Sequence, residues 1–244
     1  MPAAAVPLPG TLPLNEDWLL VDEAFAGQMA ERDRLLAEGA PVHGMTDIAT
    51  DAARETYDIV LEKLARSAAY RVSADAVTRP DGVTVTLNRT APLLTLGRLI
   101  QQDLCLMLPD GQGEHLLAGA ILCFPASWTL AEKLGQPMSR IHVPVPKYDA
   151  NITRRVQRLL DGLQPDRPIW RMNHNLYAKP DLFHPRTAAA PRSDAVPHYL
   201  RAEHQCLIRL PKTRAVLFTI HTYVLPLTAL PPEAIASLKT AHNP

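Results

Sequence analysis

The chain has 244 residues, of which 47% are hydrophobic, so it is long enough to bury a sizeable core. Its 25 basic residues balance its 25 acidic residues, which removes any electrostatic case for a nucleic-acid or anionic-membrane partner. The opening residues lack an export signal, and no run approaches the ~18 apolar residues of a membrane span. The three cysteines, Cys105, Cys123 and Cys206, form no C-x-x-C pair. We therefore expect a reduced, cytoplasmic protein.

The first part of the chain is predicted to be an extended arm followed by helices. The Pro-rich residues 1–14 are typical of an extended arm. Helical spacing of apolar residues then runs over 17–38 and ends at Gly39, a favourable residue just after a helix. A second helix is predicted over 47–68, where apolar side chains recur on one face. We expect these two helices to form an N-terminal helical layer.

The remaining chain is predicted to contain strands broken by helices. Alternating residues after Asp81-Gly82 predict a strand over 83–87, and helical spacing predicts a helix over 93–108. Further strands are expected at 115–124, 168–176, 202–210 and 215–224, and further helices at 128–134, at 151–163 and after Pro232. The later strands follow one another without a crossover helix, so the predicted fold class is α+β. We expect a mostly antiparallel sheet with helices against one face and a pocket between them.

Local catalytic motifs are missing from the sequence. It contains no G-x-G-x-x-G after a strand, no phosphate-binding loop and no G-x-S-x-G, which disfavours nucleotide cofactors and serine-hydrolase chemistry. Its nine histidines include only one loose cluster, His198, His204 and His221, so a zinc enzyme is disfavoured. A prosthetic group held by one axial side chain becomes attractive, because a heme needs only one neutral imidazole and an apolar slot.

The segment IHVPVP, residues 141–146, singles out one histidine. Each proline fixes its own backbone and holds the preceding valine extended, so His142 begins a stiff arm that can aim its ring. The simpler interpretation is a turn histidine with ordinary hydrogen bonds. Both interpretations remain open from this pattern alone.

Three stretches of the chain resemble the heme-dependent oxidative N-demethylase family: ILCFPASWTLAEKLGQPMSRIHVPVPKYD, RPIWRMNHNL and LRAEHQCLIRLPKTRAVLFTIHTYVLPL. The similarity extends upstream through LLVDEAFAGQMAERDRLL and TLGRLIQQDLCLMLP. The resemblance implies one heme-binding PAS-like domain over residues 15–244 with heme b as its cofactor. It also implies oxidative N-demethylation of a small secondary amine such as dimethylamine, with O2 and two electrons, and release of formaldehyde. The electrons are then expected from partner subunits or a separate reductase that carry NADPH, FMN and a 2Fe-2S cluster.

The resemblance carries over to six residues of this sequence. The family pattern H-x-P-V-P falls on His142, and the pattern W-R-x-N falls on Arg171 and Asn173. The pattern L-R-x-E-x-Q falls on Arg201, Glu203 and Gln205. His142 is the implied proximal iron ligand, and Arg171 and Asn173 are implied to bind the heme. Because alternate residues of a strand share a face, each of the two strand sets can point into one pocket. An arginine suits a heme propionate, and a carboxylate can hold a cationic amine or accept its proton, so Glu203 and Arg201 are candidate catalytic residues.

Several alternatives stay open. The Arg201–Glu203 pair can instead serve only to brace two strands. Three histidines stand where the family typically has tryptophan or arginine, and each is an alternative iron ligand: His174, His204 and His221. Three aromatic residues are interpreted as core rather than as a substrate cage: Phe124, Trp128 and Trp170. A heme-binding PAS-like sensor and a non-catalytic subunit are the alternative functions, because a fold does not establish catalysis.

Overall fold

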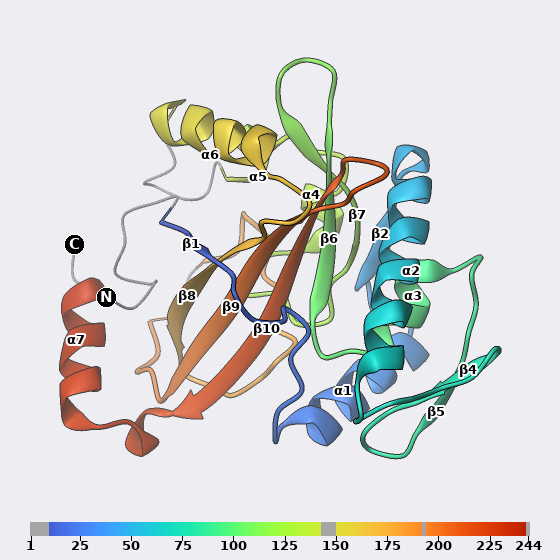
Figure 1. Cartoon of the computed structure of the whole chain (residues 1–244). Coiled ribbons are helices and arrows are strands. Elements are labelled where there is room, and N and C mark those ends of the chain that lie inside the picture. The colour runs from blue at the N-terminus through green and yellow to red at the C-terminus, as the bar shows by residue number, and fades with distance from the viewer. Residues whose placement is uncertain (1–9, 143–149, 192–193, 243–244) are drawn as a thin grey trace.

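The computed structural model describes residues 10–142, 150–191 and 194–242, and its centre is a seven-stranded antiparallel sheet (Figure 1). The strand order is β1-β8-β9-β10-β6-β7-β2, which confirms the expected antiparallel sheet. The strands are β1 (Leu12–Pro13), β2 (His43–Met45), β6 (Asp103–Pro109), β7 (His115–Ile121), β8 (Ile169–Tyr177), β9 (Tyr199–Arg209) and β10 (Val216–Pro226). A separate small sheet contains β3 (Arg71–Val72), β4 (Ala76–Thr78) and β5 (Thr84–Thr86).

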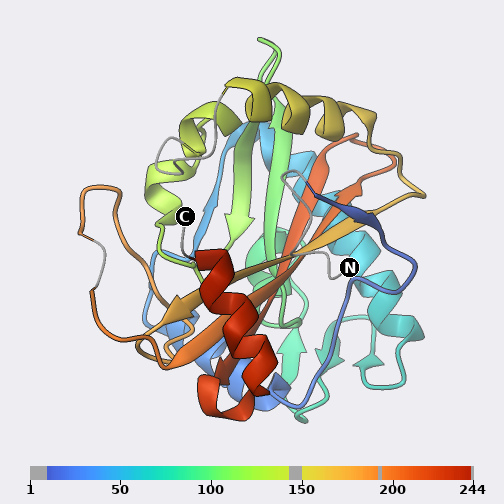
Figure 2. The same cartoon turned by 90° about the vertical axis from the view of Figure 1, so that its left-hand side faces the viewer.

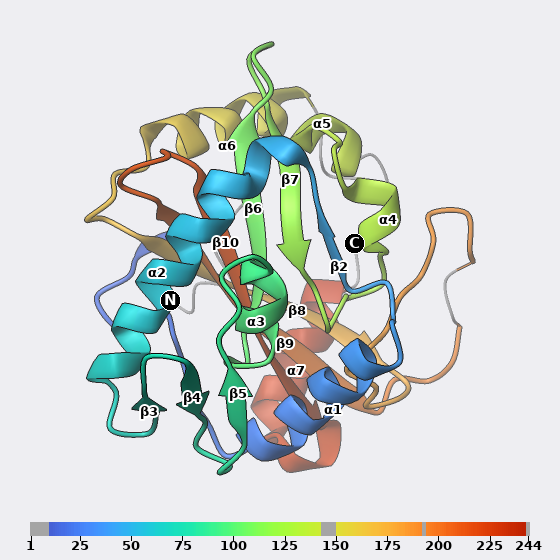
Figure 3. The same ribbon diagram turned by 90° about the vertical axis from the view of Figure 1, so that its right-hand side faces the viewer.

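Helices lie on both sides of the large sheet, rather than on the one face expected. They are α1 (Phe25–Ala37), α2 (Thr50–Arg66), α3 (Pro92–Gly97), α4 (Leu130–Lys133), α5 (Met138–Ile141), α6 (Ala150–Gly162) and α7 (Pro232–His242), with short 3-10 turns at Asp47–Ala49 and Leu227–Ala229. Figure 3 shows α1, α2 and α3 in front of the sheet, and the opposite view in Figure 2 brings α6 and α7 forward. Within the described residues, none of these helices is long and apolar enough to cross a bilayer.

The sheet separates two apolar cores, and β6 contributes to both. Leu104 and Leu106 join the core that α1, α2 and α3 cover, and we call this side the α1 face. Cys105 and Met107 join the core that α4, α5 and α6 cover, and we call this side the α6 face. Successive strand residues point to opposite sides, so the two cores follow directly from the alternation along β6.

This double burial explains why the helix predicted over 93–108 is wrong. The helix α3 ends at Gly97, and the segment from Asp103 onwards is the strand β6. A strand buried on both faces carries apolar residues at every position, so it loses the alternation that marks a half-exposed strand. A continuous apolar run of this kind cannot be told from a helix by its spacing alone.

The first predicted helix, 17–38, begins later than expected. Asp17 accepts the backbone N–H of Leu19 at 3.1 Å, and Asp22 accepts that of Ala24 at 3.0 Å, so both aspartates close local turns before α1 starts at Phe25. Such turns compete with helix formation. The described part of the predicted arm forms β1, which pairs with the edge strand β8.

The other predictions agree more closely with the structure. The helix predicted over 47–68 is α2 with a preceding 3-10 turn, and those at 128–134 and 151–163 are α4 and α6. The strands predicted at 168–176, 202–210 and 215–224 are β8, β9 and β10, and 115–124 contains β7. The strand predicted over 83–87 is confirmed as β5, although it belongs to the small sheet. The sequence patterns did not reveal β2, β3, β4 or α5.

Gly97 permits a close approach between α3 and the sheet. A Cβ atom at this position would lie 2.5 Å from Cγ1 of Ile121 in β7, well inside van der Waals contact. The same glycine's carbonyl accepts a hydrogen bond from Nε of Arg32 at 2.8 Å. A side chain at this position would therefore disturb both the apolar packing and a buried polar contact.

Candidate functional site

The residues carried over onto β8 and β9 lie side by side on the α6 face. The antiparallel register places Arg171 opposite Gln205 and Asn173 opposite Glu203. Ile169 and Leu207 point to the same side of their strands as these residues, and both pack against the core of the α6 face. Cys206 points to the opposite side and belongs to the core of the α1 face. The strand periodicity in the sequence therefore leads to one mixed cluster of cationic, anionic and amide side chains.

Glu203 is the centre of this cluster. Its carboxylate accepts hydrogen bonds from Nε2 of Gln205 at 2.9 Å, from Nδ2 of Asn173 at 3.3 Å and from Nε of Arg201 at 3.3 Å. The residue is only 5% exposed. A carboxylate has about four acceptor positions, so three donors fix its orientation and leave room for roughly one more. A cationic amine is a suitable fourth donor.

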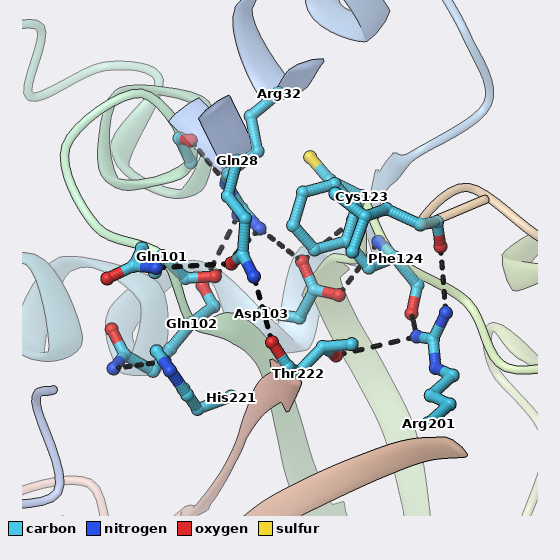
Figure 4. A network of polar contacts seen from close by, with 12 residues as sticks. Gln28, Arg32, Gln101, Gln102, Asp103, Cys123, Phe124, Arg201, His221 and Thr222 are labelled. Atoms are coloured by element: carbon cyan, nitrogen blue, oxygen red, sulfur yellow. Dashed lines mark hydrogen bonds and ion pairs between the residues drawn. The ribbon is translucent and has the colours of Figure 1, made fainter. Parts of the chain in front are cut away.

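Arg201 donates its hydrogen bonds to other groups of the protein. Its Nη1 donates to the carbonyl of Leu182 at 2.9 Å, and its Nη2 donates to the carbonyl of Phe124 and to Oγ1 of Thr222 (Figure 4). With its Nε on Glu203, this buried guanidinium has little capacity left for a ligand. The geometry favours the bracing interpretation for Arg201: it positions Glu203 and ties β9 to β10 and to the segment after β7.

Arg171 differs from Arg201 although the two belong to neighbouring strands. Its Nε is buried and has no hydrogen-bond partner among the described residues. Burial lowers the pKa of Arg171, and the nearby Glu203 carboxylate only partly offsets that effect. A buried N–H of this kind is costly unless a partner satisfies it. Arg171 is thus a donor suited to an acidic ligand.

His142 lies directly after α5, whose residues Met138 and Ile141 pack into the α6-face core. Its ring Nδ1 is 2.9 Å from the carbonyl oxygen of Met138. A carbonyl only accepts, so Nδ1 carries the proton and the lone pair of the neutral ring is on Nε2. Burial lowers the pKa of His142, which favours that neutral form. A histidine that binds a metal normally donates its other N–H in this way. The proline-rich arm from 143 to 146 lies outside the described residues.

The three alternative histidines lie on the other side of the sheet. His204 and His174 alternate with the cluster residues along β9 and β8, and the His204 ring lies 4.9 Å from that of Trp170, a residue packed against the α1-face core. His221 donates from Nε2 to Asp22 at 2.9 Å and accepts at Nδ1 from the Gln102 amide at 3.1 Å. His221 is therefore satisfied at both nitrogens. The loose cluster of His198, His204 and His221 forms no metal site within the described part of the chain.

The three aromatic candidates are also divided between the two faces of the sheet. Phe124 is buried, and the guanidinium of Arg32 lies 5.3 Å from its ring centre, so it is core as expected. Trp170 packs against the α1-face core, again as expected. Trp128 packs against the α6-face core, where Nζ of Lys133 lies 4.5 Å from its ring centre.

Lys133 is a residue that the sequence patterns missed. Burial lowers the pKa of Lys133 to about 8, an effect that the charge of the neighbouring Glu132 offsets only in part, and its ammonium group forms no ion pair within the described residues. Lys133 ends the four-residue helix α4, where it follows Glu132 and precedes Leu134, and no local motif distinguishes it. The only signal available was a lysine within a largely apolar stretch.

Two cavities are found elsewhere in the described structure. One of about 430 Å³ is lined by Glu31, Arg34 and residues 180–183, and an apolar one of about 280 Å³ lies where α7 meets β8 and the residues before β9. Neither cavity is lined by the Glu203 cluster or by His142. The site is accordingly defined by side-chain chemistry on the α6 face.

Comparison with known families assigns the chain as a whole. The model of a family described as haem-dependent oxidative N-demethylase, alpha subunit-like, matches residues 12–242. The match covers nearly the whole sequence, including both faces of the sheet and the residues of the Glu203 cluster. The chain therefore belongs to the haem-dependent oxidative N-demethylase alpha-subunit-like family.

Proposed function

We propose that this chain is the heme-binding subunit of an oxidative N-demethylase, with heme b on the α6 face and His142 as the proximal iron ligand. One observation carries the proposal. A histidine with its Nδ1 proton held by a carbonyl and an arginine with an unsatisfied buried Nε lie on the same face of the sheet. A heme with acidic side groups needs both kinds of residue.

The residues present fit such a group. Arg171 supplies a planar guanidinium for a propionate, and Asn173 borders it on the same strand face. The α6-face core supplies apolar surface for the ring through Met138, Ile169 and Phe218, all of which pack against it. The histidines of the α1 face have the thickness of the sheet between them and this cluster, which favours His142 over them as the ligand.

The proposed reaction is the oxidation of one methyl group of a small secondary amine such as dimethylamine. The amine, O2, two electrons and two protons give the demethylated amine, formaldehyde and one water. The bound heme supplies the activation of O2. Glu203, held by three donors, binds the cationic amine and takes up its proton, while Arg201 acts as a positioning residue for that carboxylate.

The proposal includes partner subunits, and the description of the family as alpha-subunit-like supports them. NADPH, FMN and a 2Fe-2S cluster are proposed on those partners or on a separate reductase. We further propose that residues 15–244 form one PAS-like domain. Its core is the run β7-β6-β10-β9-β8, with α4, α5 and α6 inserted between β7 and β8. The three buried free cysteines favour the reducing cytoplasm.

The test is the absorption spectrum of the heme-reconstituted protein and of His142→Ala. The proposal predicts a Soret band that shifts or disappears in the variant, while His204→Ala on the α1 face, the matched control, keeps the wild-type spectrum. Imidazole added to His142→Gly should restore the wild-type band. A His142→Ala spectrum identical to the wild type would refute His142 as the ligand, and a wild type that takes up no heme would refute the whole proposal.

Catalysis is tested separately from heme binding. Formaldehyde is measured after dimethylamine, O2 and a chemical reductant are added to the reconstituted protein. Glu203→Gln is expected to reduce its formation by ~100-fold or more, the range for removal of a general base. Heme binding without any formaldehyde would favour the sensor or non-catalytic alternative.

A further inference from the structure

Lys133 lies over the ring of Trp128 on the α6 face, and no carboxylate pairs with it among the described residues. Its ammonium group lies 4.5 Å from the ring centre of Trp128, and its side chain is half-buried. The well-buried guanidinium groups of Arg32 and Arg79 each contact a carboxylate, at 2.6 Å from Asp103 and at 2.6 Å from Asp81. No such partner contacts Lys133 within residues 10–142, 150–191 and 194–242. A cation–π contact only partly replaces lost hydration.

Lys133 also belongs to the face that carries the proposed heme site. Its charge disfavours protonation of His142, and the buried thiol of Cys105 in β6 is close enough to feel the same charge. Cys105 pairs with Phe218 of β10, Phe218 with Leu207 of β9, and Leu207 with Ile169 of β8. Lys133 therefore lies near Cys105, at the β6 end of this row. Ile169 forms the β8 end of the row and is two residues from Arg171.

Arg171 and Lys133 thus lie on opposite sides of one sheet face. Adjacent strands are about 4.8 Å apart, so three spacings, or ~14 Å, separate β6 from β8, the strand that carries Arg171. Neither cation has a carboxylate hydrogen-bonded to it in the described chain, and the nearby carboxylate of Glu203 already accepts three donors. Arg171 and Lys133 are thus two cations of this face without a paired carboxylate among the described residues, and a ligand with two negative charges would complement both.

We propose that Lys133 is the second carboxylate anchor of the α6 face, pairing with one propionate of the heme while Arg171 pairs with the other. This inference rests on the proposed function, because heme b provides the two carboxylates. Lys133 is a compact point charge on a flexible stem, so it tolerates a propionate in several positions, whereas the planar fork of Arg171 fixes the orientation of its partner.

The test combines replacement of Lys133 with neutralisation of the two ligand carboxylates, as in a double-mutant cycle. Apoprotein is titrated with heme b and with its dimethyl ester, in which neither propionate is charged, and the affinity and the heme dissociation rate are measured for the wild type and Lys133→Met. We expect Lys133→Met to weaken binding of heme b by tenfold or more and to leave binding of the ester unchanged. Lys133→Arg should retain most of the affinity and also shows whether a positive charge at this position is sufficient.

Lys63→Met is the matched control. Lys63 also lies over a tryptophan, 5.7 Å from the Trp18 ring centre, but it is paired with Asp17 at 2.8 Å. Its replacement should change neither titration. Equal affinities of wild type and Lys133→Met for heme b, or equal weakening for heme and ester, would overturn the inference while leaving the proposed function intact. A wild type that binds neither ligand would instead refute the proposed function, and this inference with it.

Discussion

Two arginines with buried donors, one on each face of the sheet, differ in how far the protein satisfies those donors. On the α1 face, the fully buried Arg32 donates to the carbonyls of Gly97, Gln101 and Gln102 and to Asp103 (Figure 4). On the α6 face, Arg171 has a buried Nε without a partner in the described chain. A buried charge whose bonds all end within the protein holds the fold together, whereas one that lacks partners indicates a site for a ligand.

The charged groups of the α1-face network each bond to more than one neighbour, whereas the buried Oε1 of Gln102 has no partner among the described residues. Asp103 accepts Arg32 at 2.6 Å and also the backbone N–H groups of Cys123 and Phe124 at 2.8 and 2.9 Å. The Phe124 carbonyl in turn accepts Arg201, whose Nε holds Glu203. The network therefore extends from the α1 face to the Glu203 cluster on the α6 face.

The comparison fails if Arg32 is dispensable, so its removal is the strongest test. Arg32→Met leaves the Asp103 carboxylate buried without its cation, and we expect a loss of ~3–5 kcal/mol in the free energy of unfolding. Arg34→Met is the control on the same helix, since Arg34 forms only solvent-exposed pairs, and it should cost less than ~1 kcal/mol. Urea unfolding measures both, and equal effects would contradict the structural role of the network.

Gly97→Ala tests how tightly the α1 face is packed. The added methyl group would lie 2.5 Å from Cγ1 of Ile121, so the Ile121 side chain or the backbone of α3 or β7 must shift. Overpacking of this kind costs ~1–3 kcal/mol, and urea unfolding of the variant should show it. Gly27→Ala in α1 is the control, because nothing lies within 4 Å of a Cβ there, and it should be neutral or slightly stabilising. A neutral Gly97→Ala would show that the packing is looser than the geometry indicates.

His221 on the α1 face should contribute to the pH dependence of stability. Burial lowers the pKa of His221 below its unfolded value of about 6.5, so the unfolded chain binds more protons as the pH falls. The stabilisation is present above pH 6.5 and is lost below it, with a slope of at most ~1.4 kcal/mol per pH unit from this group. In His221→Gln, the free energy of unfolding should fall less steeply between pH 7 and 5.5. An unchanged slope would show that His221 becomes protonated without cost.

Lys133→Met should give the smallest effect and the opposite sign. Burial lowers the pKa of Lys133 to about 8, so the ammonium group is held at a cost near neutral pH, and an uncharged side chain of similar length removes that cost. We expect the heme-free protein to gain ~1 kcal/mol in thermal or urea unfolding. A destabilised variant would mean that Lys133 serves the fold, as the cations of the α1 face do.

Local patterns in the sequence determined the elements and the faces. The alternation over 168–176 and 202–210 predicted both the strands and the shared face of Arg171 with Asn173 and of Arg201 with Glu203. A strand has a side-chain period of two whatever it pairs with, so this prediction needed no tertiary information. The same reasoning failed for 93–108, because burial on both faces of β6 is set by helices distant in the sequence.

Only the tertiary structure decided what each charged residue does. Arg171 and Arg201 are the same residue type on neighbouring strands, and they differ because the carbonyls of Phe124 and Leu182 reach Arg201. Lys133 gave only a weak sequence signal, because its distinguishing feature is the lack of a paired carboxylate in the described part of the chain. Whether a side chain is satisfied depends on residues that are often distant in the sequence, and the sequence alone does not specify which of them come within hydrogen-bond distance.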